Sequence, residues 1–550
     1  MKKECFFTGK MRIVPVLLVL AAMVFPSALF AGGGGSNRSQ GGRPQLAAQA
    51  SGKMNSIKVL QYDMDNQQID FHNMWWYKEL ERDTGVRVEW DLVKGANWTT
   101  TVNLRFASME LPDLIMTGSV DVEEYGVSQG LLVPLDSYLK DNMPNYYSRL
   151  YLNDADKSMY ASDGHMYFVG KLIAQNVNHN GNHYINKTWL DRVGMAIPKT
   201  VDELTAVLRA FRDQAPNGNP QTVLPMSAGG DGTKAMSSAT QGLFTHFAMF
   251  GVPLYENNSW GGYAAITSNG RVRFVADYPG FRDAVEWLAM CYSERLLDME
   301  SLTQDSNAWG VKMNAGNVGF TTYLRLINTA LSADTARNYV SIIPPASRHG
   351  VQVPRLLEVA TGDSFITIAN KYVAQSLQWV DKMLETERMM VAWNGPIRAG
   401  GPIPPTMRLL PDGKYDIISV PPNNELYNIV PVYCAPFFAP GSFYSSIYNM
   451  PPHRVERYET SRDYAAAGVL EPGSYTILGS LIKPSNQEAI ELARLYNEID
   501  KLMQETIADC IRSGVTQAKW DTFTRLLTNV GVPRYIELLQ KAYDAYASSL

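Results

Sequence analysis

Close polar pairs are the residues of this 550-residue chain whose spacing first suggests chemistry. His179 and His183 lie four positions apart, which is the spacing of a zinc-binding pair on a helix. The intervening Asn180-Gly181-Asn182 predicts a turn instead, so the two rings do not share a helix face. We therefore expect no metal site at these histidines.

Two carboxylate pairs, Glu123-Glu124 and Glu385/Glu387, are the next candidates. A glycosidase pair must flank a sugar bond across roughly 5–10 Å, and adjacency in sequence does not arrange this. Solvated helix faces explain both pairs better. The glycine run 32–35 lacks the Lys-Ser/Thr of a phosphate-binding loop. We expect no catalytic residue, no cofactor and no enzymatic activity.

Aromatic side chains with polar neighbours are the remaining candidates, and they indicate ligand contact. The chain holds 11 Trp, 29 Tyr and 19 Phe, more than a core alone explains in its polar, Gly-rich stretches. A small-molecule site is mostly apolar with a few placed polar groups, so aromatic rings with polar neighbours are candidates for ligand contact. A core or turn position remains the alternative for every candidate. The predicted ligand-binding residues are Trp75, Trp76, Trp98, Trp309, Tyr323, Asp363, Trp393, Arg398 and Tyr444.

The neighbouring Trp75 and Trp76 illustrate the argument. They begin a predicted helix directly after the first predicted strand, where a ligand edge is expected. Consecutive residues of a helix point about 100° apart, so both rings cannot face the core. At least one ring is therefore a candidate for ligand contact.

The elements that would position these residues follow an α/β order. Alternation predicts strands over residues 57–60, 86–90 and 113–116, with helices over 74–82 and 98–108 between them. This order predicts a parallel sheet whose following loops meet at one edge. The polar residues 117–119 follow the third strand and are either ligand contacts or a helix cap.

Further helices are marked by their start signals. Thr200-Val201-Asp202-Glu203 and Ser485-Asn486-Gln487-Glu488 are capping boxes. The second opens a long amphipathic helix that Gly514 ends. Residues 395–480 are rich in Pro, Gly and aromatics, and predict loops and short elements.

The N-terminus predicts export. Lys2, Lys3, Lys10 and Arg12 precede the apolar run 13–30, and small residues follow. This pattern is typical of a signal peptide over residues 1–31, and Pro15 and Pro26 make the run a poor membrane span. A flexible leader follows over 32–53. No Cys lies near the cleavage region, so we expect no lipid anchor and a periplasmic or extracellular protein.

Charge and cysteine content exclude other classes. Lys+Arg 49 and Asp+Glu 54 give a net charge of −5, and no basic stripe is visible, so nucleic acid is not an expected partner. Cys5 leaves with the signal. The remaining Cys291, Cys434 and Cys510 allow at most one disulfide and contain no CxxC pair.

A series of segments carries a family pattern in a fixed order. The most specific is 184–194 with Ile197-Pro198-Lys199-Thr200, and the others are residues 84–86, 103–108, 111–114, 130–135, 292–305, 316–320 and 519–544. Taken in this order, the segments resemble the family 1 extracellular solute-binding proteins of ABC importers, which are similar to maltose-binding protein. The resemblance covers residues 54 to 550, and the subtype is the large one for complex carbohydrates.

The resemblance implies an α/β fold of two lobes, the periplasmic-binding-protein-like type II fold, with a hinge between the lobes. We expect residues 54–165 and 316–370 in the N-terminal lobe and residues 166–315 and 371–550 in the C-terminal lobe. The implied function is capture of an oligosaccharide between the lobes and delivery to ABC permease membrane subunits, by a monomeric protein. An exported carbohydrate-active enzyme and a sensor-linked binding protein are the alternatives.

One loop departs from the family. Many relatives carry an acidic loop after the capping-box helix, and in some it binds calcium. Here Asn217 and Asn219 remain, but the expected carboxylates near Ala215 and Val223 are missing. Calcium takes six to eight oxygen ligands, several of them usually charged, so we expect an Asn/Gly turn without an ion.

Overall fold

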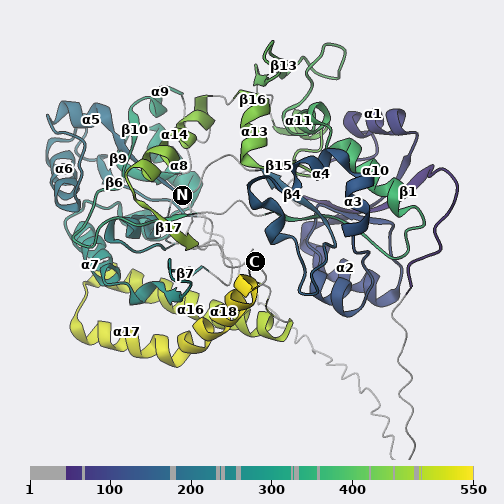
Figure 1. Ribbon diagram of the computed structural model, residues 1–550. Helices are drawn as coiled ribbons and strands as arrows, with labels where there is room; N and C mark the ends of the chain where they lie inside the picture. The colour runs from purple at the N-terminus through teal and green to yellow at the C-terminus, as the bar shows by residue number, and fades with distance from the viewer. Residues whose placement is uncertain are drawn as a thin grey trace, which may run out of the picture. The chain divides into compact units, whose positions relative to one another are not determined.

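The structure is a computed structural model, and its elements belong to the compact unit Pro44–Leu550 (Figure 1). The predicted signal segment, most of the leader and His179 lie outside the residues that the structure describes. The described residues are 45–64, 69–173, 181–230, 236, 242–254, 262–323, 326, 333–355, 360–419, 423–449, 452–475, 482, 484 and 486–548.

The first sheet has six strands in the order β15-β4-β12-β3-β1-β2. β1 pairs in parallel with β2 and β3, which confirms the predicted strand–helix–strand order. β12 runs antiparallel to both β3 and β4, whereas β15 is parallel to β4. The strands are β1 (Ser56–Asp63), β2 (Arg87–Lys94), β3 (Leu114–Met116), β4 (Val169–Ile173), β12 (Thr361–Ile366) and β15 (Phe438–Ala439).

One hydrophobic cluster, here called the first core, packs against this sheet. It runs from Met54 to Tyr448, and it includes consecutive strand residues, such as all three of Leu114–Met116, because helices cover both faces of the sheet. The helices are α1 (Trp75–Thr84), α2 (Trp98–Ser108), α3 (Asp136–Asn142), α4 (Pro144–Leu150), α10 (Val373–Met383), α11 (Thr386–Asn394), α12 (Asn423–Tyr427) and α13 (Gly441–Ile447). A small sheet of β13 (Met407–Leu409), β14 (Tyr415–Ile417) and β16 (Tyr448–Asn449) adjoins them.

The second sheet has the order β10-β5-β9-β6. β6 and β9 are parallel, and β5 runs against both β9 and β10. The capping box predicted at Thr200 and Glu203 is present and opens α6. The elements are β5 (Asn182–Asn186), β6 (Leu224–Met226), β9 (Val318–Tyr323), β10 (Tyr339–Ile342), α5 (Lys187–Arg192), α6 (Val201–Gln214), α7 (Gly280–Ser293), α8 (Ser306–Asn314) and α9 (Ala333–Ala336).

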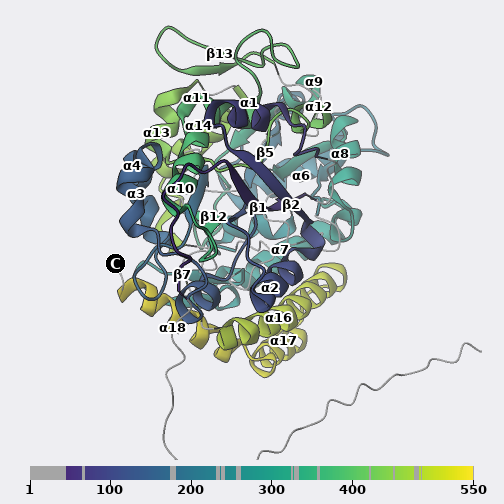
Figure 2. The same ribbon diagram turned by 90° about the vertical axis from the view of Figure 1, so that its right-hand side faces the viewer.

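A separate cluster, here called the second core, extends from Ile185 to Ala542. The predicted amphipathic helix is α16, whose Leu492, Ile499 and Cys510 are buried in this core. Figures 1 and 2 show α16, α17 and α18 grouped together. The remaining elements are β7 (Ala264–Ile266), β8 (Val272–Phe274), β11 (Val353–Arg355), β17 (Leu470–Tyr475), α14 (Pro452–Ala466), α16 (Asn486–Ser513), α17 (Gln517–Val530) and α18 (Val532–Ser548).

Strand pairing and core membership differ from the predicted lobe boundaries. The prediction places residues 316–370 in the first lobe. In the structure, β9 lies within this range but pairs with β5 and β6 in the second sheet. The prediction placed 166–173 and 371–449 in the second lobe, but β4 lies in the first sheet and α10 and α11 pack in the first core. Periodicity identifies a strand or a helix, but its partner is set by contacts that are remote in sequence.

The structure adds one long helix that the sequence analysis missed and confirms several that it predicted. α14 lies inside the stretch 395–480, which was expected to hold only loops and short elements. Its polar sequence shows no clear apolar stripe, so periodicity could not reveal it.

Among the described helices, none combines the length and apolar composition that a membrane span requires.

Candidate functional site

Polar side chains gather where the strands of the first sheet end, and we call this place the first edge. The carboxyl ends of β1, β2, β3, β4 and β15 meet the amino end of β12 there, because β12 runs in the opposite direction. Ligands of open α/β sheets bind outside the carboxyl ends of the strands. The polar residues of the first edge are Gln61, Asp63, Lys94, Thr117, Lys171 and Asp363.

Asp363, a predicted site residue, is the buried acid of this edge. Its position coincides with a register shift between β12 and β4, and its side chain is fully buried. Ser364 Oγ donates to Oδ1 at 3.0 Å, while Oδ2 accepts no hydrogen bond from the described residues and lies 3.7 Å from Lys171 Nζ. Burial raises the pKa of Asp363, although the Lys171 ammonium opposes the rise.

Two further oxygens at the first edge lack donors within the described part of the chain, namely Gln61 Oε1 and Asp63 Oδ1. The other carboxylate oxygen of Asp63 lies 2.8 Å from Lys94 Nζ. Thr117 adopts the left-handed conformation, with φ of 62°, and its Oγ1 accepts from Gln61 Nε2 at 2.5 Å. The first edge therefore presents buried acceptors that a donor-bearing ligand or water can satisfy.

Aromatic rings stand beside these polar groups. Trp393, another predicted residue, is half-buried, and its ring centroid lies 4.7 Å from that of Tyr433 and 5.0 Å from that of Phe437. Lys171 Nζ donates to the Tyr433 carbonyl at 2.6 Å and lies 5.7 Å from the Trp393 ring centroid. The structure thus brings Asp363 and Trp393 together through Lys171.

Tyr433 is a candidate that the sequence analysis missed. Tyr433 is 49% exposed, and its backbone φ is 66°, a strained value for a residue other than Gly. Strain of this kind gathers at functional sites. No local sequence signal distinguishes Tyr433 from its neighbours, because both its exposure and its φ follow from tertiary packing.

Trp75 and Trp76 diverge as helix geometry requires. Trp76 is buried in the first core, where its Nε1 donates to the Arg388 carbonyl at 3.2 Å and its backbone N–H to the Ile429 carbonyl at 3.1 Å. Trp75 is only partly buried. Trp76 therefore holds the start of α1 against the segment that leads to Tyr433.

Trp98 supports the loop after β3. It begins α2, is buried, and donates from Nε1 to the Ser119 carbonyl at 2.8 Å. Its ring lies so close to Gly118 that a Cβ at that position would stand 2.1 Å from the indole. Any side chain at residue 118 would displace this indole.

The second sheet offers a corresponding place, the second edge, where the carboxyl ends of β6 and β9 adjoin the amino end of β5. Tyr323 ends β9, is partly buried, and stacks on Trp309 with ring centroids 4.9 Å apart. Trp309 is fully buried and donates from Nε1 to Thr321 Oγ1 at 3.2 Å. Trp309 therefore backs Tyr323, and only Tyr323 keeps exposed ring surface.

The last two predicted residues lie behind the first edge and at the surface. Tyr444 is buried, and its ring centroid lies 5.0 Å from that of Tyr448 and 6.4 Å from that of Phe437, the ring that packs against Trp393. The Arg398 side chain is 78% exposed and pairs with Glu387 at 3.1 Å. Neither residue contacts the polar groups of the first edge in the described structure.

The Asn/Gly loop closes on itself. Asn217 Oδ1 accepts from the Asn219 N–H at 3.0 Å, and Asn219 Oδ1 accepts from the Gln221 N–H at 2.9 Å. Arg192 Nη1 donates to the Pro216 carbonyl at 2.5 Å.

The described residues contain no group of three or more His, Cys, Asp and Glu side chains arranged to hold a metal. Cys291, Cys434 and Cys510 are free and buried.

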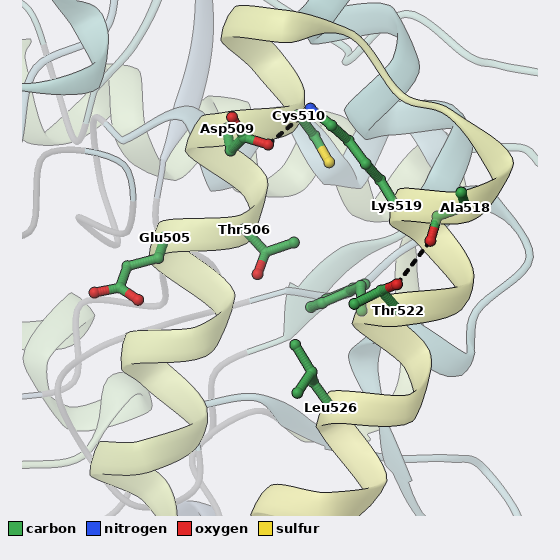
Figure 3. A pocket seen from close by; sticks show the side chains of 9 residues that line it. Glu505, Thr506, Asp509, Cys510, Ala518, Lys519, Thr522 and Leu526 are labelled. Carbon is green, nitrogen blue, oxygen red and sulfur yellow. Dashed lines mark hydrogen bonds and ion pairs between the residues drawn. The ribbon is translucent and has the colours of Figure 1, made fainter.

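Two hollows lie away from both edges. One of about 450 Å³ lies between α16 and α17, and its apolar lining includes Cys510, Phe523 and Leu526. Figure 3 shows Cys510 on one of these helices and Leu526 on the other. The other, of about 380 Å³, adjoins the Asn217–Asn219 loop and α5. Neither contains a predicted ligand-binding residue.

Comparison with known proteins identifies relatives across the chain. Residues 71–287 match the family described as bacterial extracellular solute-binding protein, a family of binding proteins rather than enzymes. FusA of Streptococcus pneumoniae, a fructooligosaccharide ABC transporter substrate-binding protein, is 23% identical over 492 residues, which cover 86% of this chain and 87% of FusA. Lipoprotein LipO of Bacillus subtilis is 25% identical over 351 residues, which cover 58% of this chain and 62% of LipO.

Solved structures share the fold. An HMO binding ABC-transporter associated solute binding protein from Bifidobacterium longum infantis has a TM-score of 0.76 at 19% identity, over 90% of this chain and 99% of its own. FusA in complex with kestose has a TM-score of 0.69 at 20% identity, over 90% of this chain and 100% of its own. The predicted family resemblance and the two-lobe type II α/β fold are confirmed.

Proposed function

The chain is homologous to the bacterial extracellular solute-binding proteins, and on that premise we propose that it captures an oligosaccharide and delivers it to the membrane subunits of an ABC importer. In this role the protein releases the sugar chemically unchanged, because binding and release break no covalent bond. FusA, which matches most of this chain, carries the same role in its name.

One observation carries the proposal: each edge presents a partly exposed ring backed by buried aromatic side chains. At the first edge, Tyr433 packs against Trp393, and Trp393 packs against the buried Phe437. At the second edge, Tyr323 stacks on Trp309. Rings held in fixed orientation cover the apolar faces of sugar units at low entropic cost.

The polar groups of the first edge complement sugar hydroxyls. Asp363 Oδ2, Asp63 Oδ1 and Gln61 Oε1 are acceptors without donors from the described residues. A hydroxyl donates one hydrogen bond and accepts others, so a sugar rim satisfies such acceptors. Bonds to carboxylates are stronger than bonds between neutral groups, and low local polarity strengthens them further.

The predicted residues divide into two roles in this proposal. Tyr323 and Trp393 contact the sugar directly, and Tyr433 joins them. Asp363 stays a predicted contact, because its side chain is fully buried. Trp75 and Arg398 stay predicted contacts. The buried rings of Trp76, Trp98, Trp309 and Tyr444 hold the contacting residues in place.

The two lobes close on the ligand. We assign one lobe to residues 45–173 and 360–449, around the first sheet, and the other to residues 181–355 and 452–548. Ligand favours the closed state by its higher affinity for that state. Export by the signal segment and a monomeric state complete the proposal.

Thermal-shift and calorimetric titration of the purified protein with kestose and fructo-nystose test the function, with sucrose as the shorter control. A ligand at 100 times its Kd adds about 2.7 kcal/mol to the free energy of unfolding, so a binder raises Tm measurably. Chromatography of the incubated sugar should recover it intact. Release of shorter sugars would establish the enzyme alternative, and no stabilisation by any oligosaccharide of a wider panel would refute the proposal.

A further inference from the structure

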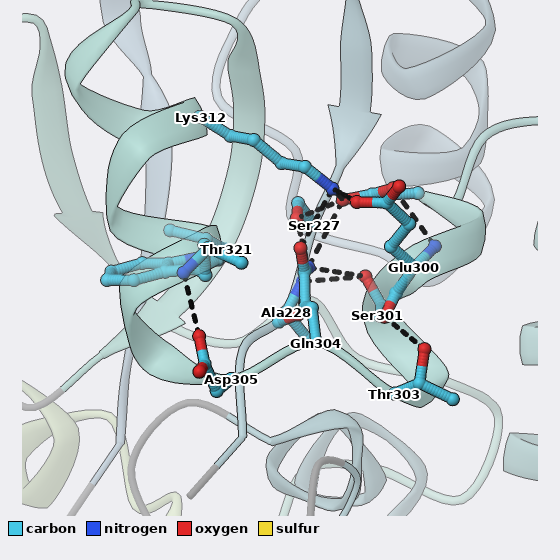
Figure 4. A network of polar contacts seen from close by, with 12 residues as sticks. Ser227, Ala228, Glu300, Ser301, Thr303, Gln304, Asp305, Lys312 and Thr321 are labelled. Atoms are coloured by element: carbon cyan, nitrogen blue, oxygen red, sulfur yellow. Dashed lines mark hydrogen bonds and ion pairs between the residues drawn. The ribbon is translucent and has the colours of Figure 1, made fainter. Parts of the chain in front are cut away.

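A network of polar contacts holds the four residues that follow β6 at the second edge (Figure 4). The Ser227 N–H donates to the Phe320 carbonyl, the Ala228 N–H to Ser301 Oγ at 3.0 Å, and the Gly230 N–H to the Gln304 carbonyl. Gln304 Nε2 donates to the Ala228 carbonyl at 2.6 Å. Side chains and backbone of the segment 298–306 therefore fix the segment 227–230.

Lys312 closes this network from α8. Its Nζ lies 2.7 Å from Asp298 Oδ2, 2.6 Å from Glu300 Oε2 and 2.8 Å from Gln304 Oε1. An ammonium group has three protons, so all three are used. The Lys312 side chain is 21% exposed and that of Asp298 is 5% exposed, which limits screening by solvent.

The charge of Lys312 determines how its partners point. Asp298 Oδ2 also accepts from Ser227 Oγ at 2.8 Å, so it joins the ammonium to the segment 227–230. The bond from Lys312 to Gln304 Oε1 fixes the amide orientation in which Nε2 faces the Ala228 carbonyl. Without the ammonium, the Asp298 and Glu300 carboxylates would repel each other.

The same helix carries the aromatic platform. Trp309 lies one turn before Lys312 on α8, and a Cβ on Gly229 would stand 2.8 Å from Trp309 Cβ. The segment 227–230 thus runs directly along Trp309, which backs Tyr323. A shift of this segment would move the ring surface that faces the second edge.

We propose that Lys312 is a positioning residue for oligosaccharide binding, whose ammonium group clamps the segment 227–230 and the Trp309–Tyr323 platform at the second edge. This inference rests on the proposed function for its ligand. The clamp itself exists without ligand, so it can be measured separately.

Hydrogen exchange on the ligand-free full chain tests the clamp. Lys312→Met keeps the apolar stem and removes the charge, and we expect amide exchange in the peptide spanning 227–230 to rise by about tenfold. Lys187→Met is the matched control, because the exposed Lys187 side chain pairs with the exposed Asp191 within helix α5, which follows strand β5 of the same sheet. Unchanged exchange at 227–230, or an equal rise throughout the chain, would overturn the clamp.

Chemical rescue separates the charge from the stem. In Lys312→Ala, n-propylammonium should restore protection of the segment 227–230, whereas n-propanol should not. Rescue by both compounds would show that Lys312 acts by filling space and would overturn the proposal. This variant also serves if Lys312→Met does not fold.

Affinity for kestose, measured by calorimetry, tests the consequence for binding. We expect Lys312→Met to weaken binding about tenfold while Lys187→Met binds like the wild type. Loss of protection with unchanged affinity would refute the positioning role. Failure of the wild type to bind any oligosaccharide would refute the proposed function alone, since the exchange experiment still decides the clamp.

Discussion

The ring of Tyr323 stacks on the fully buried indole of Trp309, with centroids 4.9 Å apart and planes inclined by 26°. The two residues belong to different elements, β9 and α8. A ring supported in this way loses little freedom when a sugar packs on its other face. The pair therefore separates two effects of mutation, one on affinity and one on stability.

Tyr323→Ala should lower oligosaccharide affinity about tenfold, because it removes ring surface while Trp309 remains buried. Tyr323→Phe keeps the ring and should retain most of the affinity. Trp309→Ala should instead lower the free energy of unfolding by about 3–5 kcal/mol, since it empties a core position. Calorimetric titration and urea denaturation measure the two quantities. Equal affinity of Tyr323→Ala and wild type would remove Tyr323 from the site.

Asp363→Asn should raise stability at neutral pH and weaken ligand binding about tenfold. Burial raises the pKa of Asp363 above its unfolded value of about 3.9, so the folded state binds the proton more tightly. Folding stability then falls as pH rises from about 3.9 through the raised pKa, and Asn removes this loss. Lys171 keeps its bond to the Tyr433 carbonyl.

Urea denaturation of Asp363→Asn at pH 7 and pH 4 checks the sign. The gain over wild type should be present at pH 7 and shrink towards pH 4. A variant that is less stable than wild type at pH 7 would mean that the Lys171 ion pair outweighs the desolvation of the carboxylate.

Gly118→Ala should destabilise the protein by about 1–3 kcal/mol, because its Cβ would stand 2.1 Å from the Trp98 indole and must displace that ring. The displaced ring would also break the bond from Trp98 Nε1 to the Ser119 carbonyl. Gly52→Ala is the matched control, since a Cβ there meets nothing within 4 Å. Tm values of the two variants decide the prediction, and equal values would contradict it.

Residues with complete local signals were placed well from sequence. Thr200 and Glu203 form a capping box whose partners are three residues apart, so the sequence contains the whole interaction. The buried stripe of α16 repeats over the length of the helix in the same way. Local patterns of this kind predict elements because their physics is local.

Burial of the candidate aromatics was not predictable in this way. Trp76 and Trp98 do follow strands, as expected. However, Trp76 donates to Arg388, which is distant in sequence, and Trp98 donates to Ser119, which lies beyond strand β3. The strained φ of Tyr433 also depends on remote packing. Sequence therefore located the edge of the first sheet, whereas tertiary contacts decide which rings face it.

The buried ring of His246 makes folding stability depend on pH. Burial lowers the pKa of His246 to about 3, whereas an unfolded histidine has a pKa of about 6.5. The His246 ring stacks on Phe320 with ring centroids 5.3 Å apart, and its centroid lies 5.5 Å from that of His183. Neither ring nitrogen of His246 has a hydrogen-bond partner within the described chain. Below about pH 6.5 the unfolded state binds the proton and the folded state does not. Stability attributable to this residue is therefore lost as pH falls from about 6.5 to about 3.

His246→Phe keeps an aromatic ring at this place and removes the proton site. Each pH unit between these pKa values is worth about 1.4 kcal/mol, so wild type should lose about 2 kcal/mol from this residue between pH 7 and pH 5, and the variant should not. Urea denaturation at both pH values measures the difference. His165→Phe is the control, because His165 lies exposed at the surface beside Asp136. An identical pH dependence for His246→Phe and wild type would show that other groups cause the acid sensitivity.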